Sequence, residues 1–175
     1  SDAGPDTVLD TIAALDAAGL RAVGGGADQA AAEAPLVLDA NGVSVGVLAF
    51  DVSGGVAATA TTPGVSTWDT SRARDAVTDL RDRVDMLVVG LHGGVEYLQR
   101  PDPALAHIVD LVAGWGADVV WGHGAHAAYP VEAVDTAGRR AVVAPGLGNA
   151  LFDQRLPGTD VGGLLEVLVD ADGVI

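Results

Sequence analysis

Two short, continuously apolar runs on either side of a helical stretch constrain the fold of this 175-residue chain more than any other feature. The runs at 85–91 (DMLVVGL) and 117–122 (ADVVWG) have the length of strands and lack alternating polar positions, which is typical of strands buried on both faces. Between them, 102–116 (DPALAHIVDLVAGWG) has helical spacing and ends at glycines. A strand–helix–strand unit normally makes its strands parallel and near neighbours. The sequence therefore predicts an α/β sheet with these two strands side by side.

Two hairpins are expected beside this unit, at 35–50 and 129–145. The first contains Asn41-Gly42, the preferred pair for a type I′ turn, and the second turns at Ala137-Gly138. The other expected elements are helices over 5–20, 27–34 and 67–84 (the last capped by Thr67 or Asp69), a short strand over 21–26, a loop over 51–67, and a last strand and turn over 162–175.

The balance of charge excludes several classes of partner. The formal net charge is −15, and all nine basic residues are arginine. Nucleic acids and anionic membrane surfaces both need basic side chains opposite their phosphates, so neither is expected to bind. Without cysteine, the chain has neither a disulfide nor a thiolate site. No apolar run approaches the roughly 20 residues that span a bilayer, so we expect membrane attachment only through segments outside this chain.

Three of the four histidines directly follow the two apolar strands. His92 comes after the first strand, and His123 and His126 come after the second. Because the carboxyl ends of parallel strands meet at one edge of a sheet, these imidazoles and the carboxylate of Glu96 are expected to converge there. Imidazole and carboxylate bind Zn, Mn or Fe. The spacing alone leaves two interpretations open, a metal site or ordinary hydrogen-bonded polar residues. His107 lies within the helical stretch, and we interpret it as structural.

Four ordered motifs resemble the CapA family of poly-γ-glutamate capsule proteins, which belongs to the calcineurin-like metallophosphoesterase superfamily. The family pattern has H-W-G-x-E-Y after a strand, then GADVVIGHHPH, QPVE and SLGNFIFDQ. The corresponding segments here are HGGVEY at 92–97, GADVVWGHGAH at 116–126, YPVE at 129–132 and PGLGNALFDQ at 145–154. The resemblance extends over essentially the whole chain.

The resemblance implies metal ligands and catalytic residues. His92 and His123 would share one divalent ion, and His126 would hold a second in the intact protein. The metal would be Mn, Fe, Zn or Mg. Glu96 matches the family's acidic position and would act as a ligand, a base or a substrate contact. Glu96 and His126 are thus the expected catalytic residues.

The resemblance also implies a substrate-binding rim. Tyr97 is expected to order this rim or to pack against it. Asn149 and Asp153 match the family's GN-x-x-F-D-Q motif, for which a purely structural role is about equally expected. Gly93 replaces the usual tryptophan, which predicts a roomier pocket.

The fold implied by the resemblance is the metallophosphoesterase-like αββα sandwich, an α/β (α+β) fold with mixed sheets whose N-terminal strands are missing here. We expect a single domain over 1–175, truncated at its N-terminus. Family members begin with a strand ending in Gly-Asp, followed by N-L-E and N-N-H motifs that supply Asp and Asn ligands. These segments are expected to have been removed, lost in evolution, or supplied by a second chain.

Two functions remain open. One is a metal-dependent phosphoesterase or hydrolase acting on a small molecule or an anionic polymer during capsule synthesis. The alternative is a non-catalytic polymer-binding or scaffold domain of a system that makes or exports an anionic polymer. The resemblance implies a bacterial protein of the cell envelope or extracellular face.

Overall fold

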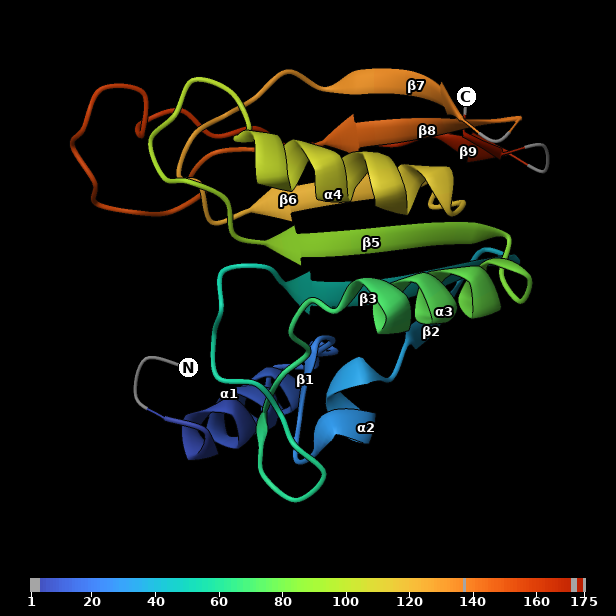
Figure 1. Ribbon diagram of the computed structural model, residues 1–175, viewed down its shortest axis with the longest axis vertical. Coiled ribbons are helices and arrows are strands. Elements are labelled where there is room, and N and C mark those ends of the chain that lie inside the picture. The colour runs from blue at the N-terminus through green and yellow to red at the C-terminus, as the bar shows by residue number, and fades with distance from the viewer. Residues whose placement is uncertain (1–3, 137, 171–172, 175) are drawn as a thin grey trace.

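One six-stranded mixed sheet organises the computed structural model, which describes residues 4–136, 138–170 and 173–174 (Figure 1). The strand order is β2-β3-β5-β6-β8-β7. The central pairs β3·β5, β5·β6 and β6·β8 are parallel, and antiparallel hairpins form both edges. The predicted α/β class and the predicted pairing of the two apolar strands are confirmed. The strands are β2 (Leu36–Ala40), β3 (Val43–Asp51), β5 (Met86–His92), β6 (Val119–His123), β7 (Glu132–Thr136) and β8 (Arg139–Ala144).

Both predicted hairpins are present. In the first, Asn41 and Gly42 have φ of 57° and 89°, the two positive values that a type I′ turn requires. The second joins β7 to β8, with Thr136 opposite Arg139. Of its two expected turn residues, Ala137 lies outside the described residues.

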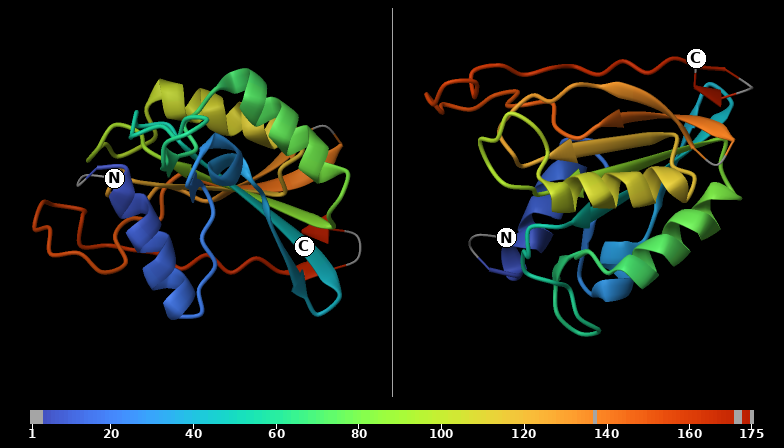
Figure 2. Two further views of the ribbon diagram at one scale, coloured as in Figure 1. Left: turned by 90° about the horizontal axis from the view of Figure 1, so that it is seen from below. Right: turned by 45° about the horizontal axis from the view of Figure 1, so that its top comes forward.

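Helices α3 (Thr70–Arg81) and α4 (Pro103–Gly114) cover one face of the sheet (Figure 2). Of the two predicted caps for α3, Asp69 is the one that accepts from the backbone, with Arg72 N at 2.9 Å. His107 is exposed on α4. The buried interior between these helices and the sheet is mainly aliphatic, with Phe50 among its members. Its largest fully buried side chains are Leu80, Leu87, Leu91, Val77, Val89, Val112 and Val120.

The remaining elements are short. Helix α1 (Asp6–Ala17) is followed by Gly19 at φ 75°, as the sequence predicts for a helix stop. The loop expected over 51–67 contains one short strand, β4. The expected last strand consists of two-residue segments, and residues 171–172 of its turn lie outside the described residues. These elements are α2 (Gln29–Glu33), β1 (Gly25–Gly26), β4 (Gly64–Val65), β9 (Val169–Asp170) and β10 (Gly173–Val174).

The opposite face of the sheet is only partly covered. The extended segment 147–168 passes along this face (Figure 2), and a cavity of about 440 Å³ lies between it and the strands. Apolar side chains from both sides line the cavity, among them Trp121 (42% exposed) and Leu164 (96% exposed). Within the described ranges, no helix is both long and apolar enough to cross a membrane.

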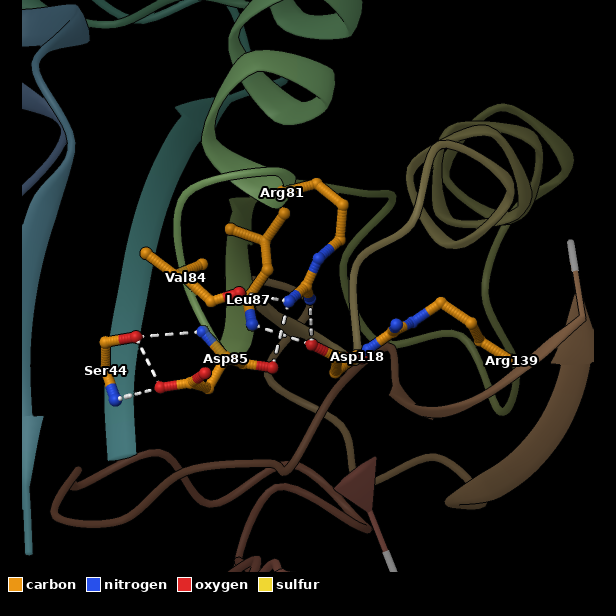
Figure 3. A network of polar contacts seen from close by, with 7 residues as sticks. All are labelled: Ser44, Arg81, Val84, Asp85, Leu87, Asp118 and Arg139. Atoms are coloured by element: carbon orange, nitrogen blue, oxygen red, sulfur yellow. Dashed lines mark hydrogen bonds and ion pairs between the residues drawn. The ribbon is translucent and has the colours of Figure 1, made fainter. Parts of the chain in front are cut away.

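A buried ion-pair network fixes the amino ends of the central strands (Figure 3). Asp118 is 3% exposed and accepts hydrogen bonds from Arg81, from Arg139 Nη2 at 2.7 Å and from Leu87 N at 2.8 Å. Arg81 also donates to backbone carbonyls just before β5. Helix α3 is thereby tied to three strands at the sheet edge opposite the histidines.

Candidate functional site

His92 and His123 lie side by side at the carboxyl ends of adjacent parallel strands. They are register partners in β5·β6, and their Nδ1 atoms are 2.9 Å apart. Asp51 ends β3 and is the register partner of His92 on its other side. The carboxyl ends of three apolar strands thus place two imidazoles and one carboxylate at one edge of the sheet. For the two histidines, this position is predicted by the parallel placement of β5 and β6.

Glycines allow this close approach. Gly93 has φ 145°, and a Cβ there would lie 2.7 Å from Val52 Cγ2. Gly124 has φ 105°, and its Cβ would lie 3.0 Å from Gly93 N and 3.1 Å from His92 Cε1. The sequence predicts that Gly93 takes part in substrate binding. The structure shows a steric reason for a glycine at this position, because the chain beside His92 packs against residue 52 without room for a side chain.

The two histidines and Asp51 line a cavity of about 470 Å³. Asp51 is 9% exposed, and its carboxylate accepts hydrogen bonds from Ser53 Oγ and Gly55 N, each at 2.6 Å. Burial by itself raises the pKa of Asp51, but these hydrogen bonds outweigh it and hold the pKa below its ordinary value. Asp51 therefore carries its negative charge at neutral pH.

Sequence reasoning missed Asp51, although the signal was available. Asp51 directly follows the apolar run of β3, just as His92 follows that of β5. The sequence predicts a hairpin for this run, but the hairpin pattern does not indicate that β3 also pairs in parallel with β5.

The pKa of His123 is lowered from its ordinary value. Desolvation by the surrounding chain is the main cause, followed by the positive charge of a protonated His92, and the Asp51 carboxylate acts in the opposite direction. A neutral imidazole is the form that binds a metal ion. His123 is thus in the form a ligand requires at neutral pH.

His126 turns toward a second group of side chains. Its Nδ1 lies 2.8 Å from Asn149 Oδ1, and its Nε2 lies 3.9 Å from Glu96 Oε1. Its ring stacks on Tyr97 with centroids 5.8 Å apart and lies 5.2 Å from the ring of Phe152. The polar–aromatic cluster around His126 thus contains both predicted catalytic residues and two of the predicted rim residues.

Two further residues complete the polar–aromatic cluster and were not predicted. Gln154 Nε2 donates to the Tyr97 hydroxyl at 2.8 Å. Thr159, 3% exposed, presents its backbone carbonyl to Asn149 Nδ2 at 3.0 Å. Asp153, a predicted rim residue, is exposed, and no hydrogen bond or ion pair joins its side chain to the described residues. The sequence signal for Gln154 was its place in the FDQ motif, whereas Thr159 has none.

The structure therefore brings together two of the three predicted metal ligands and places the third with Glu96. His126 is not among the residues that line the His92–His123 cavity. Across residues 4–136, 138–170 and 173–174, no set of three or more His, Asp or Glu side chains has an arrangement suited to holding a metal ion.

The match to known proteins covers most of the chain. Residues 1–154 match the sequence profile of a family described as bacterial capsule synthesis protein PGA_cap. The chain belongs to this family. The HGGVEY and GHGAH segments, which carry His92, Glu96, His123 and His126, lie inside the residues that match the PGA_cap profile.

Several curated proteins are similar to this PGA_cap chain. It is 34% identical over 116 residues to the PGA biosynthesis protein CapA of Bacillus subtilis, a match covering 65% of this chain and 30% of the relative. It is 28% identical over 163 residues to the capsule biosynthesis protein CapA of Bacillus anthracis, covering 88% and 38%. It is 34% identical over 148 residues to a probable polyglutamine synthesis accessory protein of Mycobacterium tuberculosis, covering 75% and 38%. The matches thus span 30–38% of the length of these relatives.

Proposed function

We propose that this PGA_cap chain contributes a divalent-metal site to a hydrolase that acts in the synthesis of an anionic capsule polymer. The observation that carries the proposal is the pair of imidazoles at the carboxyl edge of the sheet, with Nδ1 atoms 2.9 Å apart beside a charged, buried Asp51. The names of three relatives, which refer to capsule, PGA or polyglutamine synthesis, support the biological setting.

The imidazoles of His92 and His123 fit one metal ion that takes two of its ligands from this chain. Two nitrogens at about 2.0–2.1 Å from one tetrahedral ion lie about 3.3–3.4 Å from each other. The Nδ1 atoms of His92 and His123 are 2.9 Å apart, so a small outward movement of the rings would let both bind one ion. Without an ion, the same contact requires one ring nitrogen to donate its proton to the other. Asp51 adds the negative charge that favours a cation in the cavity. The metal that fits this set is Zn, Mn or Fe, as nitrogen ligands indicate, rather than Mg.

The chain's residues have separable roles in such a site. A bound divalent ion supplies Lewis-acid activation of a phosphoryl or carbonyl oxygen. Ser53 and Gly55 hold the Asp51 carboxylate in place and keep it ionised. Glu96 and His126, whose carboxylate and imidazole face each other, would take a proton from the attacking group and return it to the leaving group.

Activity in a longer protein tests the proposal. We expect the 175-residue chain alone to bind at most one ion weakly and to show no appreciable phosphoesterase activity, because His92 and His123 are the one pair of imidazoles that converges among the described residues. A longer protein that joins this chain to segments carrying Gly-Asp, N-L-E and N-N-H motifs is expected to bind two ions and to hydrolyse a generic phosphodiester in excess Mn²⁺. His123→Ala should abolish that turnover, and His107→Ala should not, because His107 is exposed on α4. Full activity of the short chain, or equal turnover by the two variants, would contradict the proposal.

The absence of a three-ligand group in the described part of the chain favours a second candidate function, in which the metal binds polymer without catalysis. An ion held by His92 and His123 would supply a positive charge that attracts the carboxylates of a polyanion. A chain with net charge −15 would otherwise repel such a polymer. Poly-γ-glutamate binding that depends on added Mn²⁺, with no hydrolysis by the longer protein, would establish this function.

A further inference from the structure

A hydrogen-bond chain with a fixed direction ends on the ring of His126. It starts at the backbone carbonyl of Thr159, an oxygen that can only accept, which faces Asn149 Nδ2 at 3.0 Å. Rotating the Asn149 amide by half a turn would place two acceptor oxygens against each other at this contact. The carbonyl therefore sets the amide orientation and directs Oδ1 toward His126 Nδ1, 2.8 Å away.

The second arm of the chain agrees with this direction. Asn149 Nδ2 also donates to Gln154 Oε1 at 3.2 Å. Gln154 Nε2 in turn donates to the Tyr97 hydroxyl at 2.8 Å. The Tyr97 oxygen is then an acceptor from Gln154. The pKa of Tyr97 is raised, chiefly by its interaction with the Glu96 carboxylate, which favours the protonated phenol.

The backbone holds the two rings in place at an energetic cost. His126 and Tyr97 have φ of 57° and 64°, in the left-handed region that side chains other than glycine seldom adopt. Tyr97 N donates to Ala125 O at 2.9 Å, which joins the two loops. Strain of this kind persists where the surrounding structure over-determines it, and it concentrates at functional sites.

We propose that Asn149 is a positioning residue that fixes neutral His126 as the Nδ1–H tautomer, so that Nε2 presents its lone pair on the side of Glu96. An Oδ1 acceptor requires a proton on Nδ1, and a neutral imidazole then has none on Nε2. His126 Nε2 is thereby set to accept a proton or to bind an ion. The tautomer itself does not depend on the proposed function, and only the use made of Nε2 rests on it.

Nitrogen-15 NMR of the histidine side chains tests the proposal directly. Spectra of the metal-free chain, in the presence of a chelator and at a pH where the imidazoles are neutral, should show His126 with a protonated Nδ1 and an unprotonated Nε2. Exposed His107 provides an internal reference without a fixed tautomer. A neutral His126 with its proton mainly on Nε2 would overturn the proposal in the unmodified protein, independently of any variant.

Two variants separate positioning from general structural support. Asn149→Leu, of similar size but without an acceptor, is expected to shift His126 toward a mixture of tautomers. Gln154→Ala removes only the hydrogen bonds of Gln154 to Asn149 and Tyr97 and should leave the His126 tautomer unchanged. Backbone amide spectra check that both variants fold. An Asn149→Leu spectrum with the His126 tautomer unaltered would contradict the role of Asn149. Because metal is removed throughout, this result does not depend on whether His92 and His123 bind an ion.

Discussion

At the residue scale, the lack of a side chain at Gly124 allows His92 and His123 to lie close together. Gly124 lies against the His92 ring, and an added methyl group would sit 3.1 Å from Cε1 and 3.2 Å from Nδ1. We expect Gly124→Ala to push the two imidazoles apart and to weaken metal binding at least about tenfold, since it disturbs a ligand. The unfavourable φ of 105° should also lower the free energy of unfolding by about 1–3 kcal/mol. Metal titration and urea unfolding measure the two effects.

Gly42→Ala is the matched control for Gly124→Ala. Gly42 also has a positive φ, 89°, but an added Cβ would meet nothing within 4 Å. This variant should lose stability through its backbone while keeping the metal affinity of the unmodified chain. An equal loss of metal affinity in both variants would show that Gly124 does not act by letting the rings of His92 and His123 lie close together.

At the element scale, the buried network around Asp118 holds the amino ends of the strands. We expect Asp118→Ala to reduce the free energy of unfolding by about 3–5 kcal/mol, because it leaves Arg81 without its buried partner. Asp135→Ala is the control, because Asp135 is exposed and pairs with Arg140 at 3.6 Å, a contact worth about 0–1 kcal/mol. Chemical unfolding of both variants measures the difference. Similar losses in the two variants would contradict the role given to the network.

The start of α4 also depends on one carboxylate. Asp102 accepts from Ala104 N and Leu105 N at the helix start and from Val95 N at 2.9 Å. Asp102→Ala should cost about 0.5–2 kcal/mol of unfolding free energy, as for other N-caps. The exposed Asp110 of the same helix provides the control, and Asp110→Ala should change stability by less than about 0.5 kcal/mol.

The Asp102 contribution should depend on pH with a defined sign. Hydrogen bonds from the backbone, first that of Val95, lower the pKa of Asp102 in the folded protein. A group with a lowered folded pKa stabilises the fold fully above its unfolded pKa, about 3.9, and loses that contribution as the pH falls through the folded value. The stability difference between Asp102→Ala and the unmodified chain should therefore shrink below about pH 4. A difference that grows on acidification would contradict this assignment.

The elements with strong local signals were predictable. The runs that became β5 and β6 are continuously apolar, and Asn41-Gly42 specifies its turn by φ alone. The meeting of His92 with His123 followed from the rule that parallel strands share a carboxyl edge. The network around Asp118 was not predictable, because it joins residues distant in sequence through side-chain packing. The turn of His126 toward Asn149 also escaped prediction, since it depends on the left-handed backbone at His126 and the path of residues 147–159.

At the scale of the whole molecule, the two edges of the sheet have different chemistry. The amino edge contains the Asp118 network, in which the charges are paired within the fold (Figure 3). The carboxyl edge contains Asp51, His92 and His123 around a cavity, with the polar–aromatic cluster around His126 nearby in the same strand-end loops. The ion-pair network and the candidate site thus lie at opposite ends of the strands, so a folded variant of the network should keep the arrangement of His92 and His123.

The most direct measurement of the proposed metal site is calorimetric titration of Zn²⁺ into the 175-residue chain and three alanine variants. We predict one weakly bound ion per chain for the unmodified protein, with affinity reduced at least about tenfold by His92→Ala or His123→Ala, since each removes a ligand. His107→Ala should bind as the unmodified chain does, and circular dichroism should show all four proteins folded. An unmodified chain that binds no Zn²⁺, or a loss in His107→Ala equal to that in the other two, would contradict the account.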